Sequence, residues 1–499
     1  MGFQHLKENV ALFRAELTRE PFLNCRVLGF ACIRGWVYLM FMGAAASSIT
    51  WTGAPIPPLF YLLSTASLFA TLLASALAGR AFLSLMGHPA ARSAGPLLTS
   101  LGTLLLANAA GQGAFPLACG LIGAIVTGIG SGIIDLGYGE LYRNEPPSRT
   151  VIEIPLAFFL AALTFALIAI LPPVAGCLMS AALPLVSGWI LFVTQHAWSR
   201  KRIPAVQPIA FNLGAFAWRI GLCACLIGIA DGMVRAAFIT SNQLSMNAFL
   251  QWPLGAAALV TMAIVYASAF LSTQRGTRTI YKAAIFVMAF FFMLLPVFTQ
   301  AQNVESTMAL AGYGTFNVLI WMLLAEISYN YRLSSTAVFG IGWGMVTLGV
   351  LLGAFAGAIV EQFAPFAPQQ MSLIALIATT AILFSFFFVF KESDLIELTE
   401  DTSDGEGEAP GGEAPEAAKR PPKPRFHDRC VEVATQFELS PKETEVMILF
   451  AKGRSATRIQ EELFISKGTV STHLRHIYQK MDVHSKQELL DIIEGIDRP

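Results

Sequence analysis

The chain has 499 residues, of which 55% are hydrophobic and only 13% are charged. Soluble domains carry about 25% charged residues, so this composition excludes an ordinary soluble protein and predicts a membrane protein. The formal net charge of zero excludes little, because it averages a long apolar block with two charged ends. We expect an all-α protein with a polytopic bundle of membrane helices followed by a small helical domain.

The first 21 residues are polar and amphipathic, and they lack the short apolar core and small-residue cleavage site of a signal peptide. We expect residues 1–21 to remain as a cytoplasmic segment. Residues 22–390 then contain about twelve apolar segments, each near the roughly 20 residues that cross a bilayer as a helix. The expected spans are 22–48, 55–78, 93–111, 114–137, 151–171, 173–195, 213–239, 248–271, 280–299, 307–327, 335–360 and 370–390.

Loops between these segments alternate in charge. Alternate loops carry basic residues, and the others contain no lysine or arginine. The basic loops contain Arg80, Arg92, Arg143, Arg149, Arg200, Lys201, Arg202, Arg275, Arg278, Lys282 and Arg332. Basic loops remain in the cytoplasm, so the pattern predicts a multi-pass protein of the cell inner membrane with both termini in the cytoplasm.

A basic connection, residues 196–212, divides the spans into two sets of six, 22–195 and 213–390. In topology this region resembles the major facilitator superfamily of transporters, whose two halves are pseudo-repeats. The resemblance implies that spans one, four, seven and ten line a central cavity. The family's charged motif between spans two and three is incomplete here, because Gly79, Arg80 and Arg92 occur without an acidic residue.

Several ionisable residues lie inside the apolar spans, where they are costly and usually pair or line a cavity. Those on spans one, four and seven, with nearby tryptophans, are candidate ligand-binding residues: Arg34, Trp36, Asp135, Asp231, Arg235, Trp252, Trp321 and Trp343. A site of this mixture suits a small molecule with apolar and anionic groups. Ion pairing within the bundle is an equally weighted alternative, since Asp231 and Arg235 are four residues apart on one helix face. Arg219 and Glu326 are weaker candidates that fit the membrane interface.

No pattern for catalysis or metal binding is present. The seven cysteines are scattered, and no phosphate loop or histidine-rich spacing occurs. The glycines around Asp135 favour close helix packing over phosphate binding. We therefore expect neither an enzyme nor a bound metal or cofactor.

Residues 391–429 combine acidic residues with Gly and Pro, then end in the basic run KRPPKPR. Such a composition cannot bury a core and predicts a disordered linker. Residues 430–499 form the expected C-terminal domain. Ser440, Pro441 and Glu443 make a capping box that starts a helix. A second helix should start at Ser455, and a third should follow Ser466.

The third predicted helix has two distinct faces. Val470, Leu474, Ile477 and Met481 form an apolar stripe, and polar or basic residues lie opposite. A short helix, a turn and a second helix of this kind are the geometry that reads DNA in a major groove. The segment resembles the LuxR (GerE-type) helix-turn-helix family. The matching residues are Leu439, Glu443, Glu445, Val446, Gly453, Ser455, Ile459, Leu463, Ser466, Thr469, Val470, His473, Ile477, Tyr478, Lys480, Val483, Ser485 and Leu489.

The LuxR resemblance implies a four-helix domain that binds double-stranded DNA as a homodimer. The residues expected at the DNA are Lys467, Thr469, Ser471, Thr472, Arg475 and His476. The sequence departs from the family pattern at Gln460, Ser471 and Asp482. A small bundle that binds another protein is the alternative, because acidic residues slightly outnumber basic ones after residue 430.

Together these features predict a membrane-embedded transcription regulator. Its partners would be the lipid bilayer, promoter DNA and an unknown small molecule that the bundle senses. A transporter with a fused regulatory domain is the second hypothesis, and a membrane scaffold whose last domain binds protein is the third.

Overall fold

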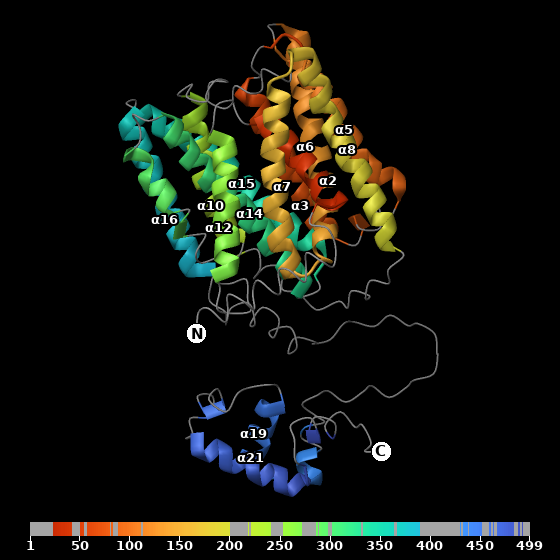
Figure 1. The fold of residues 1–499 in the computed structure, drawn as a ribbon, viewed down its shortest axis with the longest axis vertical. Coiled ribbons are helices and arrows are strands. Elements are labelled where there is room, and N and C mark those ends of the chain that lie inside the picture. Colours follow the sequence, from red (N-terminus) through yellow and green to blue (C-terminus); the bar gives the residue numbers. More distant parts are fainter. Residues whose placement is uncertain are drawn as a thin grey trace, which may run out of the picture. The chain divides into compact units, whose positions relative to one another are not determined.

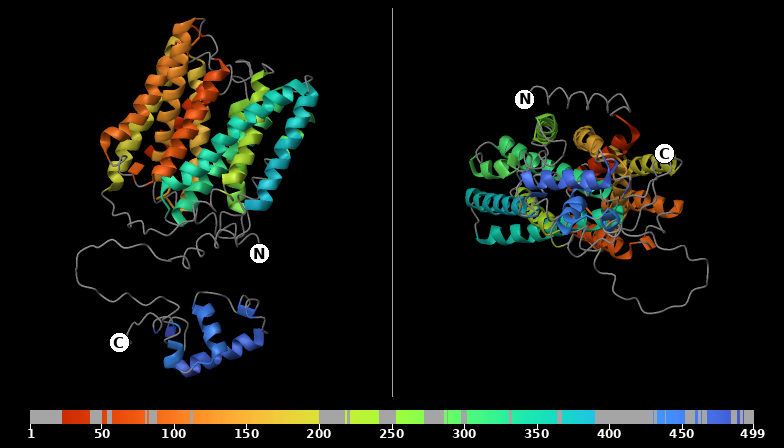
Figure 2. Two further views of the ribbon diagram at one scale, coloured as in Figure 1. Left: turned by 180° about the vertical axis from the view of Figure 1, so that it is seen from behind. Right: turned by 90° about the horizontal axis from the view of Figure 1, so that it is seen from below.

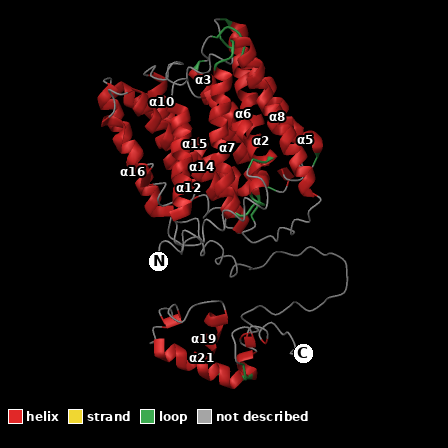
Figure 3. Cartoon of the chain, viewed as in Figure 1, coloured by secondary structure: helices red, strands yellow, loops and turns green. Residues whose placement is uncertain are grey.

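The computed structural model describes residues 23–41, 50–53, 57–79, 81–82, 88–110, 113–199, 218, 221–240, 253–271, 286–287, 289–297, 302–330, 333–363, 367–389, 430, 433–437, 439–451, 459–460, 463, 467–483, 488–489 and 492. The chain divides into two compact units, Met1–Glu406 and Gly407–Pro499. Regular structure in both is helical, and no strand occurs among the described residues (Figure 3). The predicted N-terminal segment and linker lie outside the described residues.

The first unit is a bundle of long helices. Its first half contains α2 (Cys25–Phe41), α3 (Pro58–Ala78), α5 (Pro89–Leu106), α6 (Ala114–Tyr142), α7 (Pro147–Ala169) and α8 (Pro173–Ser199). Its second half contains α10 (Leu222–Thr240), α12 (Pro253–Leu271), η3 (Leu295–Val297), α14 (Gln302–Asn330), α15 (Ser335–Phe363) and α16 (Ala367–Val389). Each predicted span overlaps described helix, the ninth only through pieces of 286–297. The all-α fold class, predicted from the length of the apolar segments, is therefore confirmed.

Length and composition of the described helices fit a bilayer. Six of them are long and apolar enough to cross a membrane, and three shorter apolar helices accompany them. Large apolar side chains are exposed on the outside of the bundle, such as Leu77 at 75% and Ile170 at 69%. A lipid-facing surface explains this exposure, because hydrocarbon solvates apolar side chains and helices satisfy their own backbone groups.

Helices of each half pack closely, and Figures 1 and 2 show the two halves side by side. In the first half α2 packs on α7 and α8, and α6 packs on α3 and α5; in the second α10 packs on α15 and α16, and α12 on α14. Glycine permits the closest approaches. A Cβ on Gly130 would lie 2.6 Å from the carbonyl oxygen of Gly95, and one on Gly228 would lie 2.5 Å from that of Val346. The glycines near Asp135 thus serve helix packing, as predicted.

The halves meet through α3 against α15 and through α7 against α12 and α14. Hydrogen bonds between the described residues cross this junction, and two of them lie near one end of the bundle. The Ser335 hydroxyl on α15 donates to Glu140 on α6 at 2.6 Å, and the Tyr266 hydroxyl on α12 donates to the Ile152 carbonyl on α7 at 2.8 Å. Both bonds lie at the end of the bundle where α6 ends and α7 begins.

The second unit has its own hydrophobic core, formed by residues that include Cys430, Val446, Ile459, Val470 and Ile477. Its two longest described helices are α19 (Pro441–Ala451) and α21 (Lys467–Met481). The predicted capping box is present: the Glu443 amide donates to the Ser440 hydroxyl at 3.3 Å, and the Ser440 amide donates to the Glu443 carboxylate at 2.8 Å. The start of the predicted second helix lies outside the described residues.

Candidate functional site

One face of α2 carries the main polar groups inside the bundle. Arg26, Phe30 and Arg34 are four residues apart, so they lie above one another on the same helix face. All three are buried, with exposed fractions of 4%, 0% and 3%. The two arginines are separated by eight residues, or about 12 Å along the helix. Each arginine forms the centre of a separate charge layer.

The first layer surrounds Arg34. Its guanidinium forms an ion pair with the Asp135 carboxylate on α6, and the indole N–H of Trp343 on α15 donates to the other carboxylate oxygen at 3.0 Å. Three aromatic rings lie against the guanidinium. Its Cζ is 5.1 Å from the ring centre of Phe30, 5.0 Å from that of Trp321 and 5.6 Å from that of Trp343. These are cation–π distances, so the aromatic rings partly replace the solvation that Arg34 loses.

Two N–H donors of this Arg34 layer have no acceptor among the described residues. They are Nε of Arg34 and the indole Nε1 of Trp321, both buried. A buried donor without an acceptor costs about 1–3 kcal/mol, so such groups are rare in folded proteins. In this layer the described donors therefore outnumber the acceptor atoms that Asp135 supplies.

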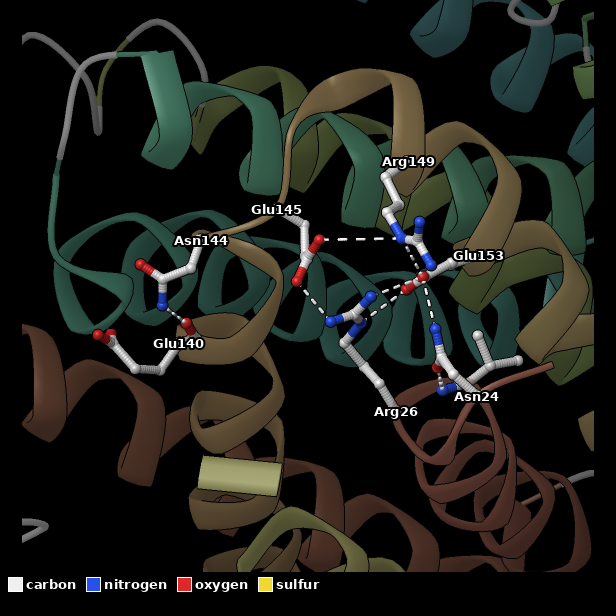
Figure 4. Close-up of polar contacts among 8 residues, drawn as sticks. Asn24, Arg26, Glu140, Asn144, Glu145, Arg149 and Glu153 are labelled. Carbon is white, nitrogen blue, oxygen red and sulfur yellow. Dashed lines mark hydrogen bonds and ion pairs between the residues drawn. The ribbon is translucent and has the colours of Figure 1, made fainter. Parts of the chain in front are cut away.

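The second layer surrounds Glu153 on α7 (Figure 4). Arg26 binds both its oxygens, with Nε 2.7 Å from one and Nη2 2.6 Å from the other. Arg149 Nε donates to Glu153 at 2.9 Å, and the Asn24 amide donates at 2.8 Å. Arg26 also pairs with Glu145, which lies 4.0 Å from Arg149. The described members of this layer carry two positive and two negative charges, and Glu153 accepts four bonds.

Sequence reasoning missed this Glu153 layer. Arg143 and Arg149 were expected as loop charges. Arg143 does lie in the connection after α6, but it is buried and pairs with Glu140 at 3.4 Å. For Arg149 the expectation was wrong, because α7 already begins at Pro147, and the buried arginine pairs there with Glu153. Two signals were available: the four-residue spacing of Arg26, Phe30 and Arg34, and the carboxylate of Glu153 within an apolar helix.

The structure brings together four of the eight candidate ligand residues: Arg34, Asp135, Trp321 and Trp343. Trp36 lies about 200° around α2 from Arg34, and its indole donates to the Thr103 hydroxyl at 2.9 Å. Its role at a ligand stays a prediction.

The remaining candidates are less defined. Asp231 is buried on α10, and the Arg235 side chain one turn later lies outside the described side chains. Trp252 and Arg219 lie outside the described residues, and Glu326 is half-buried on α14. The predicted pair of Asp231 with Arg235 therefore stays a prediction.

In the C-terminal unit, α21 presents the face expected at DNA. Thr469, Ser471, Thr472 and Arg475 are exposed, whereas Val470, Ile477 and Met481 are buried in the core. His476 is half-buried, and the Lys467 side chain lies outside the described side chains. The helix therefore rests on its apolar stripe and leaves small polar residues and one arginine accessible.

Glu443 attaches α19 to α21. Its carboxylate accepts a bond from Lys480 at 2.8 Å and lies 3.6 Å from Nδ1 of His476. Partial burial raises the pKa of Glu443, but the hydrogen bonds from Lys480 and Ser440 outweigh it and lower the pKa to about 2. The carboxylate is thus ionised at neutral pH and fixes the orientation of the exposed helix.

The end of α21 explains one departure from the family pattern. Asp482 has a φ of +51°, and the Val483 amide donates to the Tyr478 carbonyl at 3.0 Å. This is a left-handed helix end, where glycine is usual and aspartate is tolerated.

Comparison with known proteins agrees with this geometry. Residues 438–493 match the family described as "Bacterial regulatory proteins, luxR family". The oxygen regulatory protein NreC of Staphylococcus carnosus is 45% identical over 53 residues, which are 11% of this chain and 24% of that protein. NreC of Staphylococcus haemolyticus matches over the same length with 45% identity. The chain thus spans 24% of the length of these relatives.

The C-terminal segment is therefore a LuxR-type helix-turn-helix domain, a DNA-binding domain of transcription regulation. This confirms the resemblance seen in the sequence.

The membrane unit is similar in fold to solved transporters. A bacterial homologue of the iron transporter ferroportin, in an outward-facing state, has a TM-score of 0.52 at 15% identity, covering 76% of this chain and 98% of its own. The human organic anion transporter MFSD10 has a TM-score of 0.51 at 16% identity, covering 74% and 100%. At this identity the likeness shows the fold alone. The bundle has the major facilitator fold, and it is joined in one chain to a LuxR-type domain.

Proposed function

We propose that the protein is a membrane-embedded one-component transcription regulator, in which the bundle senses a small molecule and the tethered helix-turn-helix domain binds promoter DNA. One observation carries the proposal: a single chain joins a domain with an exposed recognition helix to a membrane bundle with an incompletely coordinated charge site. We place the protein in the inner membrane with both termini in the cytoplasm, where DNA is accessible.

The Arg34 layer is suited to sensing because it contains residues from both halves of the bundle. Arg34 and Asp135 belong to the first half, whereas Trp321 and Trp343 belong to the second. A ligand that changes these contacts favours one arrangement of the halves over another. It shifts the equilibrium only as far as its affinities for the two arrangements differ.

Dimerisation of the chain is the simplest way in which ligand binding to the bundle would change DNA binding. Two LuxR-type domains on neighbouring chains would bind two half-sites, and linking two weak contacts raises the overall affinity without a new contact. Ligand binding would then control occupancy by bringing chains together.

The test is chromatin immunoprecipitation of the full-length tagged protein and its Arg475→Ala variant. We expect discrete peaks for the wild type and their loss in the variant, because Arg475 is the exposed arginine of α21. Lys442→Ala is the matched control: it also removes one exposed positive charge, but from α19. Peaks that survive in Arg475→Ala, or no peaks under any growth condition, would overturn the proposal and favour a protein-binding domain.

A transporter with an attached regulatory domain is the second candidate, and the fold of the bundle favours it. Vesicles containing the purified protein would show counterflow of a substrate, and Asp135→Asn would abolish it. Counterflow in the absence of any effect of the substrate on DNA occupancy would support transport instead of sensing.

A further inference from the structure

The two charge layers of α2 differ in how completely their carboxylates are coordinated. Glu153 accepts four bonds, and Arg26 binds it through two nitrogens. Asp135 accepts one bond from Arg34 and one from Trp343. Arginine can bind a carboxylate through two parallel bonds, which is its strongest arrangement. Arg34 does not reach this arrangement with Asp135, since its Nε has no acceptor.

Aromatic rings surround the Arg34 guanidinium. Phe30, Trp321 and Trp343 lie within 5.6 Å of its guanidinium carbon, and Phe339 lies 5.0 Å from Trp321 between ring centres. Aromatic rings of this kind pack against a planar apolar group with a gain beyond the area that they bury. The unpaired indole N–H of Trp321 offers a second donor beside the guanidinium.

We infer that Asp135 is an internal counter-ion that occupies the place of a ligand carboxylate, and that the ligand is an aromatic monocarboxylate bound by Arg34 among Phe30, Trp321 and Trp343. This inference rests on the proposed small-molecule sensing by the bundle. A free carboxylate can bind Nε and one Nη together, whereas Asp135 is fixed to α6 and pairs with a single nitrogen. The ligand therefore releases Asp135 from Arg34, and Asp135 is the group that reports binding.

The charges favour an anion over the other classes of aromatic ligand. An amine would lie beside the fixed positive charge of Arg34, and would have to compete with it for Asp135. A neutral amide would stack on the rings but leave Arg34 with less charge compensation than Asp135 gives it. An anion replaces the charge of the carboxylate and also satisfies the unpaired donors.

The experiment uses purified full-length protein in detergent and three probes with the same apolar body: 4-phenylbutyrate, 4-phenylbutanamide and 4-phenylbutylamine. Calorimetry measures binding, and DNA is absent, so failure of gene regulation cannot be confused with failure of binding. We expect the wild type to bind 4-phenylbutyrate only. In Asp135→Asn, affinity for 4-phenylbutyrate should rise about tenfold or more, because the internal competitor is gone; tenfold corresponds to about 1.4 kcal/mol.

A second site variant, Trp343→Phe, tests the inference if Asp135→Asn fails to fold, and Glu445→Gln serves as the control. Trp343→Phe keeps the aromatic wall but removes the bond that holds Asp135, so 4-phenylbutyrate should bind several-fold more tightly. Glu445→Gln removes an exposed carboxylate of the C-terminal unit and should leave affinity unchanged. Weaker or unchanged carboxylate binding in both site variants, preferential binding of the amine, or no binding of 4-phenylbutyrate in any form would overturn the inference.

Discussion

The Arg34 and Glu153 layers use the same chemistry, a buried arginine and a buried carboxylate, yet they differ in coordination and in origin. In the Glu153 layer the carboxylate accepts four bonds, and the contacts described here join residues of the first half of the bundle, at the start of α2, on α7 and in the short connection before α7 (Figure 4). The Arg34 layer is incompletely coordinated and takes Trp321 and Trp343 from the second half. The difference teaches that burial of a charge does not identify a functional site.

Which half of the bundle supplies the residues of a layer decides how that layer responds when the halves move. The Glu153 layer moves as part of one half, so rearrangement of the halves leaves its bonds intact. The Arg34 layer lies where the halves meet, so any rearrangement changes its contacts. A saturated ion network within one half is suited to stability, whereas an incomplete one between two halves is suited to a response.

Glu153→Gln should have the largest effect on stability. It leaves Glu145 as the carboxylate described beside Arg26 and Arg149, and breaking a buried pair in this way costs about 3–5 kcal/mol. Thermal unfolding of the full-length protein in detergent measures it. Glu140→Gln is the control, because it weakens one hydrogen bond from Ser335 across the junction and one ion pair with the neighbouring Arg143, and should cost about 1–2 kcal/mol. A Glu153→Gln melting curve that overlays the wild type would contradict the stabilising role of this layer.

The C-terminal unit also contains a carboxylate with several hydrogen-bond donors, Glu443, which can be compared with Glu153. Its pKa is lowered from 4.5 to about 2, so the stability it provides is complete above about pH 4.5 and is lost as pH falls towards 2. The shift corresponds to about 3 kcal/mol, which exposure of Lys480 to solvent reduces to about 2. Denaturation of a 430–499 fragment, which has its own core, at several pH values measures it.

In the same fragment, Glu443→Gln should remove this acid dependence. The control is Glu445→Gln, since Glu445 forms an exposed pair with Lys442 at 2.7 Å and should contribute less than about 1 kcal/mol. Equal losses in the two variants at neutral pH would show that Glu443 does not join α19 to α21.

Asp135→Asn should destabilise the bundle less than Glu153→Gln, by about 1–2 kcal/mol. The ion pair with Arg34 is lost and the two hydrogen bonds to the carboxylate are weakened, but the aromatic rings around Arg34 continue to stabilise its charge and offset part of this loss. Thermal unfolding beside Glu153→Gln, in the same detergent, ranks the two variants. A loss as large as that of Glu153→Gln would mean that Asp135 is as much a structural partner as Glu153.

The smallest expected effect is the difference in stability between variants of two tryptophans of the Arg34 layer. Trp343→Phe loses a hydrogen bond to Asp135, whereas Trp321→Phe removes an N–H that has no acceptor. Both lose similar volume, so Trp343→Phe should be the less stable by about 1 kcal/mol. Unfolding midpoints of the two variants give this difference directly, and the reverse order would mean that the Trp321 N–H is satisfied in solution.

Much of the candidate site was predictable, but its coordination was not. Arg34, Asp135, Trp321 and Trp343 stand out in the sequence as polar or aromatic residues on apolar spans. Trp36 stands out in the same way, yet its indole bonds to Thr103. Sequence spacing cannot separate these cases, because it gives the face of a helix and not the helix that the face meets.

The sequence by itself determined the helical bundle and the helix-turn-helix domain, because hydrophobic length specifies a span and a local capping box specifies a helix start. It also determined the exposed face of α21 through the apolar stripe opposite. Only the tertiary structure decided the partners of the buried charges. Asp135 lies 101 residues from Arg34 and 208 from Trp343, and Glu153 lies 127 from Arg26. Such pairs form when helices distant in the chain pack together, and no local pattern records which helices will meet.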